Sequence, residues 1–286
     1  PDREFNVHPD VRSIYDVQYI LTWMPPIGDL KRYPNLKAIF SIGAGCDHIL
    51  RDPEVPRDIP IVRLIDDASV RDMSHFALHW ALHFQRNFHI YAKQQRIRRW
   101  QRQPYHTVDE HCVGVLGLGG MGTPIARLFA DLGFEVAGWS RTRRKVDKVT
   151  CLAGLDELPQ LLGKTSIVVS VLPLTSDTDG LLNSERFALM KDGSFLINIG
   201  RGSVINDVDL IAALDSGKIA GAALDVFATE PLPAEHPFWG HSHVHITPHA
   251  AGPTNDTSAV AQIVSNIEKI ERGEEPYPVW DWALGY

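Results

Sequence analysis

A glycine-rich segment that joins a short apolar run to a helical pattern constrains the fold more than any other feature of this sequence. The segment reads GLGGMG over residues 117–122, a G-x-G-x-x-G pattern, and the apolar run CVGVL at 112–116 directly precedes it. A strand, a glycine loop and a helix in this order form the phosphate-binding turn of dinucleotide-binding folds. The sequence therefore predicts a doubly wound α/β domain, against the alternative of a glycine-rich turn without a ligand.

Five of the six residues of this glycine loop have an expected role. Gly117 permits the tight turn, Gly119 lets the backbone approach a pyrophosphate, and Gly122 allows the helix to pack closely on the strand. The backbone N–H groups of Gly120 and Met121 lie at the start of the predicted helix. We expect these groups to face the phosphates of the cofactor.

Short apolar runs alternate with helical patterns from about residue 112 to 247. The predicted strands are 112–116, 135–139, 167–172, 194–199, 219–226 and 243–247. The predicted helices are 122–132, 155–163, 184–190 and 206–216. Strands that are apolar on both faces and separated by helices are typical of a parallel sheet covered on both sides. Asn206 and Asp207 are candidate caps for the last of these helices.

The N-terminal part of the chain repeats this alternation in a shorter form. Strands are predicted at 17–22, 37–41 and 61–64, a helix from about 71 to 98, and a C-terminal helix at 256–271. We expect two domains. A substrate-binding domain would span 1–87 and be completed by 256–286, and a dinucleotide-binding domain would span 88–255.

Net charge and cysteine content indicate which kinds of partner and which cellular compartment to expect. The net charge is −7, from 28 basic and 35 acidic residues, which argues against a nucleic-acid partner. No apolar run approaches the ~20 residues of a membrane span, and no export signal is visible. Three scattered cysteines favour a reducing, cytoplasmic setting. No metal site is expected, because the evenly spaced histidines at 75, 79 and 83 lack cysteine or carboxylate neighbours.

The end of the second predicted strand bears on the choice of dinucleotide. An NAD site usually has an acidic residue there to bind the ribose hydroxyls. Here the residues are Ser140, Arg141, Thr142 and Arg143, with no carboxylate before Asp147. Arginines can pair with the 2′-phosphate of NADP(H) through charge-assisted hydrogen bonds. The sequence therefore favours NADP(H) over NAD(H), with a solvated basic loop as the alternative.

Three polar residues follow successive predicted strands of the larger domain. Arg201 follows 194–199, Glu230 follows 219–226, and His249 follows 243–247. Because ligands bind outside the carboxyl ends of the strands in open parallel sheets, all three should lie on the cofactor side. Reduction of a 2-oxo acid needs a proton donor and a cation that binds the carboxylate, which a histidine backed by a carboxylate and an arginine can supply. Each residue taken singly could instead be structural.

With these residues, the sequence resembles the D-isomer-specific 2-hydroxyacid dehydrogenase family, most closely its glyoxylate/hydroxypyruvate reductase A branch. The resemblance covers almost the whole chain. The matching stretches are Ser41–His48, 117–122, Leu172–Thr175, Asn198–Gly202, Leu224–Pro231 and Thr247–Ala251, and Ser140–Thr142 is similar to the NADP signature of the branch.

The resemblance implies a role for several residues. Arg201 would hold the carboxylate and keto oxygen of the substrate. His249 would be the general acid with Glu230 as its partner, and Asp225 would hydrogen-bond the nicotinamide amide. The remaining implied contacts are Leu172, Pro173, Ile199, Arg201 and His249 with the cofactor, and Trp23, Met24, Ala44 and Gly45 with the substrate.

The resemblance also implies an architecture. Two Rossmann-like domains are expected, a cofactor domain with a doubly wound parallel sheet and a smaller flavodoxin-like substrate domain, with the active site in the cleft between them. A homodimer would form through the larger domains with the helix near 88–100. The family pattern has a further strand and helix before the segment equivalent to 1–16, so the first domain is expected to be incomplete here.

The leading functional prediction is an NADPH-preferring reductase that converts glyoxylate to glycolate and hydroxypyruvate to D-glycerate. Phenylpyruvate stays open as a substrate because Trp23 and Met24 could form an adaptable apolar wall. One alternative is an NAD-linked phosphoglycerate or D-lactate dehydrogenase, which Arg141 without an acidic neighbour argues against. The other is a nicotinamide-sensing, corepressor-like binding protein, which would keep the same three polar residues.

Overall fold

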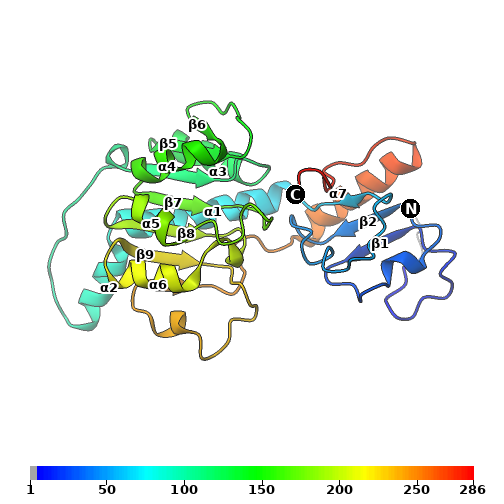
Figure 1. Cartoon of the computed structure of the whole chain (residues 1–286), viewed down its shortest axis with the longest axis horizontal. Coiled ribbons are helices and arrows are strands. Elements are labelled where there is room, and N and C mark those ends of the chain that lie inside the picture. The colour runs from blue at the N-terminus through cyan, green and yellow to red at the C-terminus, as the bar shows by residue number, and fades with distance from the viewer. Residues whose placement is uncertain (1–4) are drawn as a thin grey trace. The chain divides into compact units, whose positions relative to one another are not determined.

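The computed structural model describes residues 5–286 and divides into two compact units. The smaller unit holds the chain up to Asp67 together with Thr254–Tyr286, and the larger unit is Ala68–Pro253 (Figure 1). The larger unit therefore begins with helix α1 (Asp67–Gln85), whereas the boundary expected from the sequence lay at residue 87. The reason is packing, since Ala77 and Phe84 of α1 are buried in the core of the larger unit.

Seven parallel strands form the sheet of the larger unit. They are β4 (Cys112–Leu116), β5 (Glu135–Ser140), β6 (Thr150–Ala153), β7 (Ile167–Ser170), β8 (Ser194–Asn198), β9 (Ile219–Leu224) and β10 (Val244–Ile246). Their order across the sheet is β10-β9-β8-β7-β4-β5-β6, and all pairs are parallel. The chain changes direction across the sheet between β4 and β7, which is the switch point where doubly wound folds bind ligands.

Helices cover both faces of this sheet. Ile125 and Phe129 of α3 (Gly122–Asp131) share one core with α1. Leu161 of α4 (Gly154–Lys164) and Leu210 of α6 (Asp207–Asp215) belong to the core on the other side, which α5 (Ser184–Leu189) also lines. Apolar strands between two helical layers confirm the expected doubly wound α/β fold.

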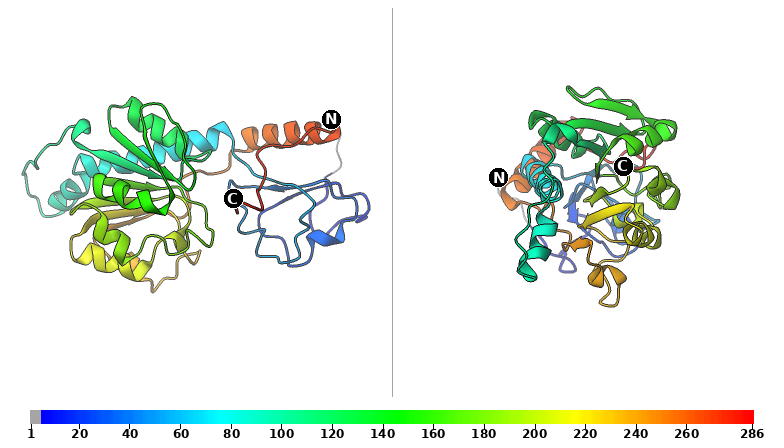
Figure 2. Two further views of the ribbon diagram at one scale, coloured as in Figure 1. Left: turned by 45° about the horizontal axis from the view of Figure 1, so that its top comes forward. Right: turned by 90° about the vertical axis from the view of Figure 1, so that its left-hand side faces the viewer.

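The smaller unit contains a second parallel sheet, of three strands in the order β1-β2-β3. The strands are β1 (Tyr19–Thr22), β2 (Ala38–Ser41) and β3 (Ile61–Val62). Helix α7 (Asp256–Glu271) lies beside these strands (Figure 2). Its Ile267 packs with Phe40 and Val62 in one buried cluster. The C-terminal helix therefore completes the N-terminal unit, with the bounds expected from its pattern.

Two local features differ from the sequence-based expectation. The helix expected over 71–98 is split into α1 and α2 (Phe88–Arg96), because Asn87 between them has a left-handed backbone, with φ of 59°. Strand β6 was not predicted, since the four residues TCLA at a sheet edge carry no clear pattern. Short 3-10 helices lie at Leu30–Arg32, Val108–Glu110, Gly202–Val204 and Pro237–Gly240.

Over residues 5–286, none of the helices combines the length and the apolar character needed to cross a bilayer.

Candidate active site

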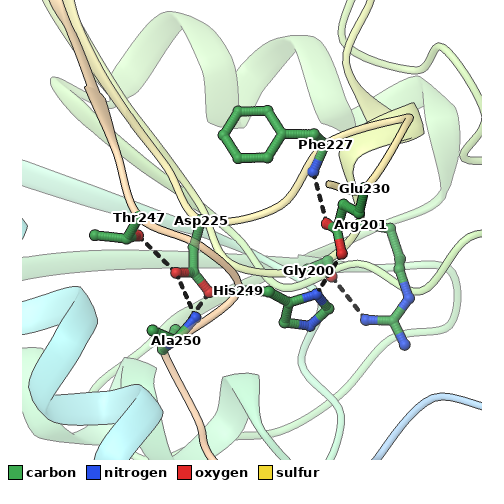
Figure 3. A network of polar contacts seen from close by, with 9 residues as sticks. Gly200, Arg201, Asp225, Phe227, Glu230, Thr247, His249 and Ala250 are labelled. Atoms are coloured by element: carbon green, nitrogen blue, oxygen red, sulfur yellow. Dashed lines mark hydrogen bonds and ion pairs between the residues drawn. The ribbon is translucent and has the colours of Figure 1, made fainter. Parts of the chain in front are cut away.

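The three polar residues that follow successive predicted strands gather at one edge of the larger sheet. Arg201 follows β8, Glu230 lies in the loop after β9, and His249 follows β10. These strands are neighbours and run parallel, so their carboxyl ends meet at the same edge. Figure 3 shows the Arg201, Glu230 and His249 side chains close together there.

A histidine–carboxylate pair forms the centre of this site. His249 Nδ1 lies 2.7 Å from Glu230 Oε2, and the other carboxylate oxygen, Oε1, accepts a hydrogen bond from the backbone N–H of Phe227 at 2.9 Å. The carboxylate can only accept, so Nδ1 is the donor in this contact. Nε2 is then the ring nitrogen that can exchange a proton with a ligand. Both side chains are partly exposed, so a small molecule can reach them.

The turn that carries His249 is held by a buried carboxylate. His249 has φ of 52°, a left-handed conformation that costs energy in a residue other than glycine. Asp225, which is 1% exposed, accepts hydrogen bonds from the Thr247 hydroxyl at 2.6 Å and from the backbone N–H groups of Ala250 and Ala251 at 2.8 and 2.9 Å. These contacts give Asp225 a positioning role for His249. Its expected contact with a nicotinamide amide stays a prediction.

The loop that carries Arg201 is held by side-chain hydrogen bonds to its own backbone carbonyls. Arg201 Nη1 donates to the carbonyl of Gly200 at 2.8 Å, and the buried Asn198 side chain donates to the carbonyl of Arg201 at 3.0 Å. A Cβ atom on Gly202 would lie 1.9 Å from the carbonyl carbon of Phe227. The Arg201 loop and the loop that leads to Glu230 therefore approach as closely as they do only because residue 202 is glycine.

We expect Gly202→Ala to lower both stability and activity. The added methyl group must push the two loops apart, and overpacking of this kind costs about 1–3 kcal/mol, or roughly 2–4 °C in Tm for each kcal/mol in a chain of this size. Thermal unfolding of the two proteins measures the change. Gly240→Ala is the control, because no atom lies within 4 Å of its added Cβ. An unchanged Tm for Gly202→Ala would show that the two loops can separate without cost.

The glycine loop has the geometry that a pyrophosphate requires. Gly117 has φ of 103°, and a Cβ on Gly122 would lie 1.7 Å from the carbonyl oxygen of Gly117. Beside Gly119 no atom lies within 4 Å of an added Cβ, and Gly119 and Gly120 are exposed. Helix α3 begins after Met121 with no side chain capping its N-terminus. An open backbone surface at an uncapped helix N-terminus fits a dinucleotide phosphate.

The basic loop after β5 is partly engaged within the protein. Ser140 Oγ donates to the carbonyl of Thr142 at 2.8 Å. Arg143 forms an ion pair with Glu157 and donates to the carbonyl of Cys151 at 3.0 Å. Arg141 is exposed at the end of the strand. Arg143 would have to exchange its present partners to bind a 2′-phosphate.

The other expected cofactor residues lie at the ends of β7 and β8. Leu172 and Ile199 are each 4% exposed, and their side chains belong to the cores on either side of the sheet. The carbonyl of Pro173 accepts a hydrogen bond from the Thr178 hydroxyl at 2.7 Å. A Cβ on Gly200 would lie 2.6 Å from the carbonyl oxygen of Leu172, so this segment and the start of the Arg201 loop are in close contact.

The expected substrate residues of the smaller unit form a compact group of their own. The Trp23 ring stacks on the His48 ring with centroids 3.8 Å apart, and a Cβ on Gly43 would lie 2.6 Å from the indole. Met24 is 59% exposed. The carbonyl of Ala44 accepts from Arg63 Nε at 2.7 Å, and that of Gly45 accepts from Ser41 Oγ at 3.0 Å.

Several residues that shape this site were not predicted from the sequence to have a role. Thr247 binds Asp225, Asn198 holds the Arg201 loop, and Gly202 allows the close approach to Phe227. One signal was present in the sequence, because Gly200 and Gly202 on either side of Arg201 indicate a loop that approaches other backbone closely.

Comparisons with known proteins place the chain in a family. Residues 78–251 match the family model described as the NAD binding domain of D-isomer specific 2-hydroxyacid dehydrogenases. The chain is 40% identical over 273 residues to the glyoxylate/hydroxypyruvate reductase A of Yersinia enterocolitica, covering 94% of this chain and 87% of that protein.

Solved structures of similar proteins superimpose closely on this chain. A D-isomer specific 2-hydroxyacid dehydrogenase from Xanthobacter autotrophicus Py2, in complex with NADPH and MES, is 42% identical with a TM-score of 0.93, covering 96% of this chain and 87% of that one. An NADPH-dependent glyoxylate/hydroxypyruvate reductase from Sinorhizobium meliloti, in complex with NADP and sulfate, is 34% identical with a TM-score of 0.91, covering 97% of this chain and 89% of that one. By sequence and by structure, the chain belongs to the D-isomer specific 2-hydroxyacid dehydrogenase family.

Proposed function

We propose that this protein is an NADPH-preferring reductase of short 2-oxo acids, with glyoxylate and hydroxypyruvate as its substrates. The observation that carries the proposal is the 2.7 Å pair between His249 Nδ1 and Glu230 Oε2, at the same sheet edge as Arg201. Relatives named glyoxylate/hydroxypyruvate reductase A, and similar structures that hold NADPH or NADP, support the choice of substrate and cofactor.

His249 and Glu230 supply the acid–base part of the reaction. NADPH, when bound, supplies the hydride that reduces the substrate carbonyl carbon. As negative charge develops on the carbonyl oxygen, His249 donates the proton on Nε2 to it. The Glu230 carboxylate stabilises the imidazolium form before transfer and holds the ring orientation.

Arg201 supplies the anchor for the substrate. Its guanidinium is a planar fork that can bind the two oxygens of a carboxylate. Its Nη1 also donates to the Gly200 carbonyl at 2.8 Å, which helps to fix the direction of the side chain. From the family resemblance we further assign Trp23, Met24, Ala44 and Gly45 to substrate contact.

The basic loop after β5 would select the cofactor. We expect Arg141→Ala to lower kcat/KM for NADPH by about 10–100-fold, the cost of losing a hydrogen bond to a charged group, and to leave kcat/KM for NADH nearly unchanged. Arg144→Ala, which removes a neighbouring exposed cation, is the matched control. Equal losses with both nucleotides, or equal losses in both variants, would remove Arg141 as the selector.

Exposed apolar side chains support a homodimer through the segment at and after α2. Phe88, Ile97 and Trp100 are 53%, 68% and 101% exposed. Side chains of this kind are usually covered when they gather on one surface. Sedimentation equilibrium should give a single species of twice the chain mass, whereas a monomer at micromolar concentration would contradict this assembly.

Initial rates test the proposed function directly. NADPH and NADH oxidation should be followed with glyoxylate, hydroxypyruvate, pyruvate and phenylpyruvate. The proposal requires a strong NADPH preference, with glyoxylate or hydroxypyruvate as the fastest substrate. A preference for NADH would point to an NAD-linked dehydrogenase. Tight nucleotide binding without turnover on any of the four acids would point to a nicotinamide-sensing protein.

A further inference from the structure

A short loop of the smaller unit has all of its backbone carbonyls engaged in hydrogen bonds. The loop spans residues 42–45 and follows β2. Its first two carbonyls accept from the Thr254 hydroxyl at 2.9 Å and from the backbone N–H of Leu64 at 3.1 Å. Its last two carbonyls accept from Arg63 Nε at 2.7 Å and from Ser41 Oγ at 3.0 Å. The carbonyl oxygens of this loop are therefore all directed toward other groups of the protein.

Two N–H groups of the same loop point the other way. In a trans peptide the C=O and the following N–H lie in opposite directions. The carbonyl of Ala44 points toward Arg63, so the N–H of Gly45 points away from it. The carbonyl of Gly43 points toward Leu64, which directs the N–H of Ala44 in the same manner. In the part of the chain that the structure describes, neither of these two N–H groups has an acceptor, and both residues are partly exposed. Neighbouring N–H groups of this kind can bind an anion.

Arg63 supplies the one charged donor among the four hydrogen bonds described above. Its contact with the Ala44 carbonyl, at 2.7 Å, is also the shortest of the four. A hydrogen bond from a guanidinium is stronger than one from a neutral donor. It also polarises the peptide group that it binds, and the N–H of Gly45 belongs to that same peptide group. Arg63 therefore fixes the direction of this N–H and strengthens it as a donor.

The backbone of Arg63 is held on both sides by the C-terminal part of the smaller unit. Its N–H donates to the carbonyl of Pro278 at 2.8 Å, and its carbonyl accepts from Gln262 Nε2, on α7, at 2.9 Å. Gln262 Oε1 accepts in turn from the backbone N–H of Ile65 at 3.1 Å. The base of the Arg63 side chain therefore has a fixed position, and less conformational entropy is lost when its guanidinium holds the loop.

The other three hydrogen bonds to the loop carbonyls are less suited to this role. The bond to the first carbonyl directs the N–H of Gly43, which is already used, because it donates to Ser41 Oγ at 3.2 Å. The bond to the last carbonyl directs the N–H of Cys46, a residue that is fully buried. Leu64 donates through its backbone, which most substitutions leave in place. Among the described contacts of the loop, Arg63 is therefore the side chain that directs an N–H group available to a ligand.

We propose that Arg63 is a positioning residue for the substrate carboxylate, and that it acts through the Ala44 carbonyl on the N–H of Gly45. The inference rests on the proposed function, in which Ala44 and Gly45 contact the substrate. In this role Arg63 transfers neither a proton nor a hydride. The substrate carboxylate is bound alike before and during hydride transfer, so Arg63 contributes to KM rather than to kcat.

Binding of oxamate, an unreactive analogue of a 2-oxo acid, tests this role when it is titrated by calorimetry into the NADPH complex of the full chain. Arg63→Met removes the donor and keeps much of the volume, and should raise the Kd of oxamate about tenfold, as for the loss of one hydrogen bond. KM for glyoxylate should rise by a similar factor, whereas kcat should change less than about threefold. Arg63→Lys keeps the charge but moves the donor nitrogen one bond further along the side chain, and should recover part of the loss.

A charge-matched control separates this role from a general loss of charge. Lys37→Met removes an exposed cation from the same unit and should change neither Kd nor KM. The proposal is overturned if the wild type does not bind oxamate, if Arg63→Met loses no more affinity than Lys37→Met, if Arg63→Lys binds as tightly as the wild type, or if kcat falls while KM is unchanged. If thermal unfolding shows that Arg63→Met does not fold, Arg63→Lys decides.

The oxamate titration does not depend on turnover, so it can be told apart from a test of the proposed function. A chain that reduces none of the four acids would overturn the proposed function, and the effect of Arg63 on oxamate binding would still be measured. A wild type that reduces glyoxylate, together with an Arg63→Met variant of unchanged oxamate affinity, would overturn only the role of Arg63.

Discussion

Replacing His249 by glutamine should lower kcat for reduction of glyoxylate by about 10²–10⁴-fold, the usual contribution of a positioned general acid. Glutamine keeps a polar side chain of similar length but has no proton to give near neutral pH. His249 is held by Glu230 at 2.7 Å and by a turn with φ of 52°, so its Nε2 has a defined position. Steady-state kinetics with NADPH measure the effect.

Two further measurements test the role of His249. The Kd for NADPH, from fluorescence titration, should stay nearly unchanged, because the glycine loop lies after a different strand. Glu230→Gln should lower kcat less than His249→Gln, because the ring keeps its proton donor and loses only the carboxylate that orients it. Unchanged turnover in His249→Gln would remove this residue as the proton donor.

Replacing Arg201 by methionine should lower kcat/KM for glyoxylate by about 10²–10³-fold, the range for loss of one preorganised electrostatic contact. Methionine fills a similar volume without charge. The loop beneath Arg201 is held by the Asn198 side chain and by the close approach of Gly202 to Phe227, so the guanidinium is presented by a rigid backbone. Steady-state kinetics over a range of glyoxylate concentrations give the change.

Arg201→Lys is the informative companion to this substitution. Lysine keeps the positive charge but lacks the planar fork, so it should restore only part of the lost kcat/KM. Oxalate or oxamate, which resemble the substrate and do not react, should bind both variants less tightly than the wild-type protein. If Arg201→Met bound these inhibitors as well as the wild type, the substrate carboxylate would have to be held elsewhere.

Apart from β6, the order of strands in the larger unit followed from the sequence alone. Strands buried on both faces are continuously apolar, so the runs at 112–116 and 167–172, which contain β4 and β7, were visible without a structure. The helix at 256–271 was also found with its bounds. The break at Asn87 was not, because a single left-handed residue leaves the helical spacing of apolar residues intact on both sides.

The choice of Arg201, Glu230 and His249 also came from the sequence, for a topological reason. Residues that directly follow successive strands of a parallel sheet must lie at one edge, whatever the details of packing. The glycine loop is predictable for the same reason, since its strand, turn and helix are contiguous in the chain.

Contacts between distant segments were decided only by the tertiary structure. Asp225 and Ala250 are 25 residues apart, and only the folded structure shows that the Asp225 carboxylate accepts a hydrogen bond from the backbone N–H of Ala250. The ion pair between Arg143 and Glu157 was likewise not predictable from the sequence. Sequence patterns report periodicity along one element, whereas such contacts depend on how elements pack. The sequence therefore determined six of the seven strands of the sheet and the polar residues that follow them, and the packing decided what those residues touch.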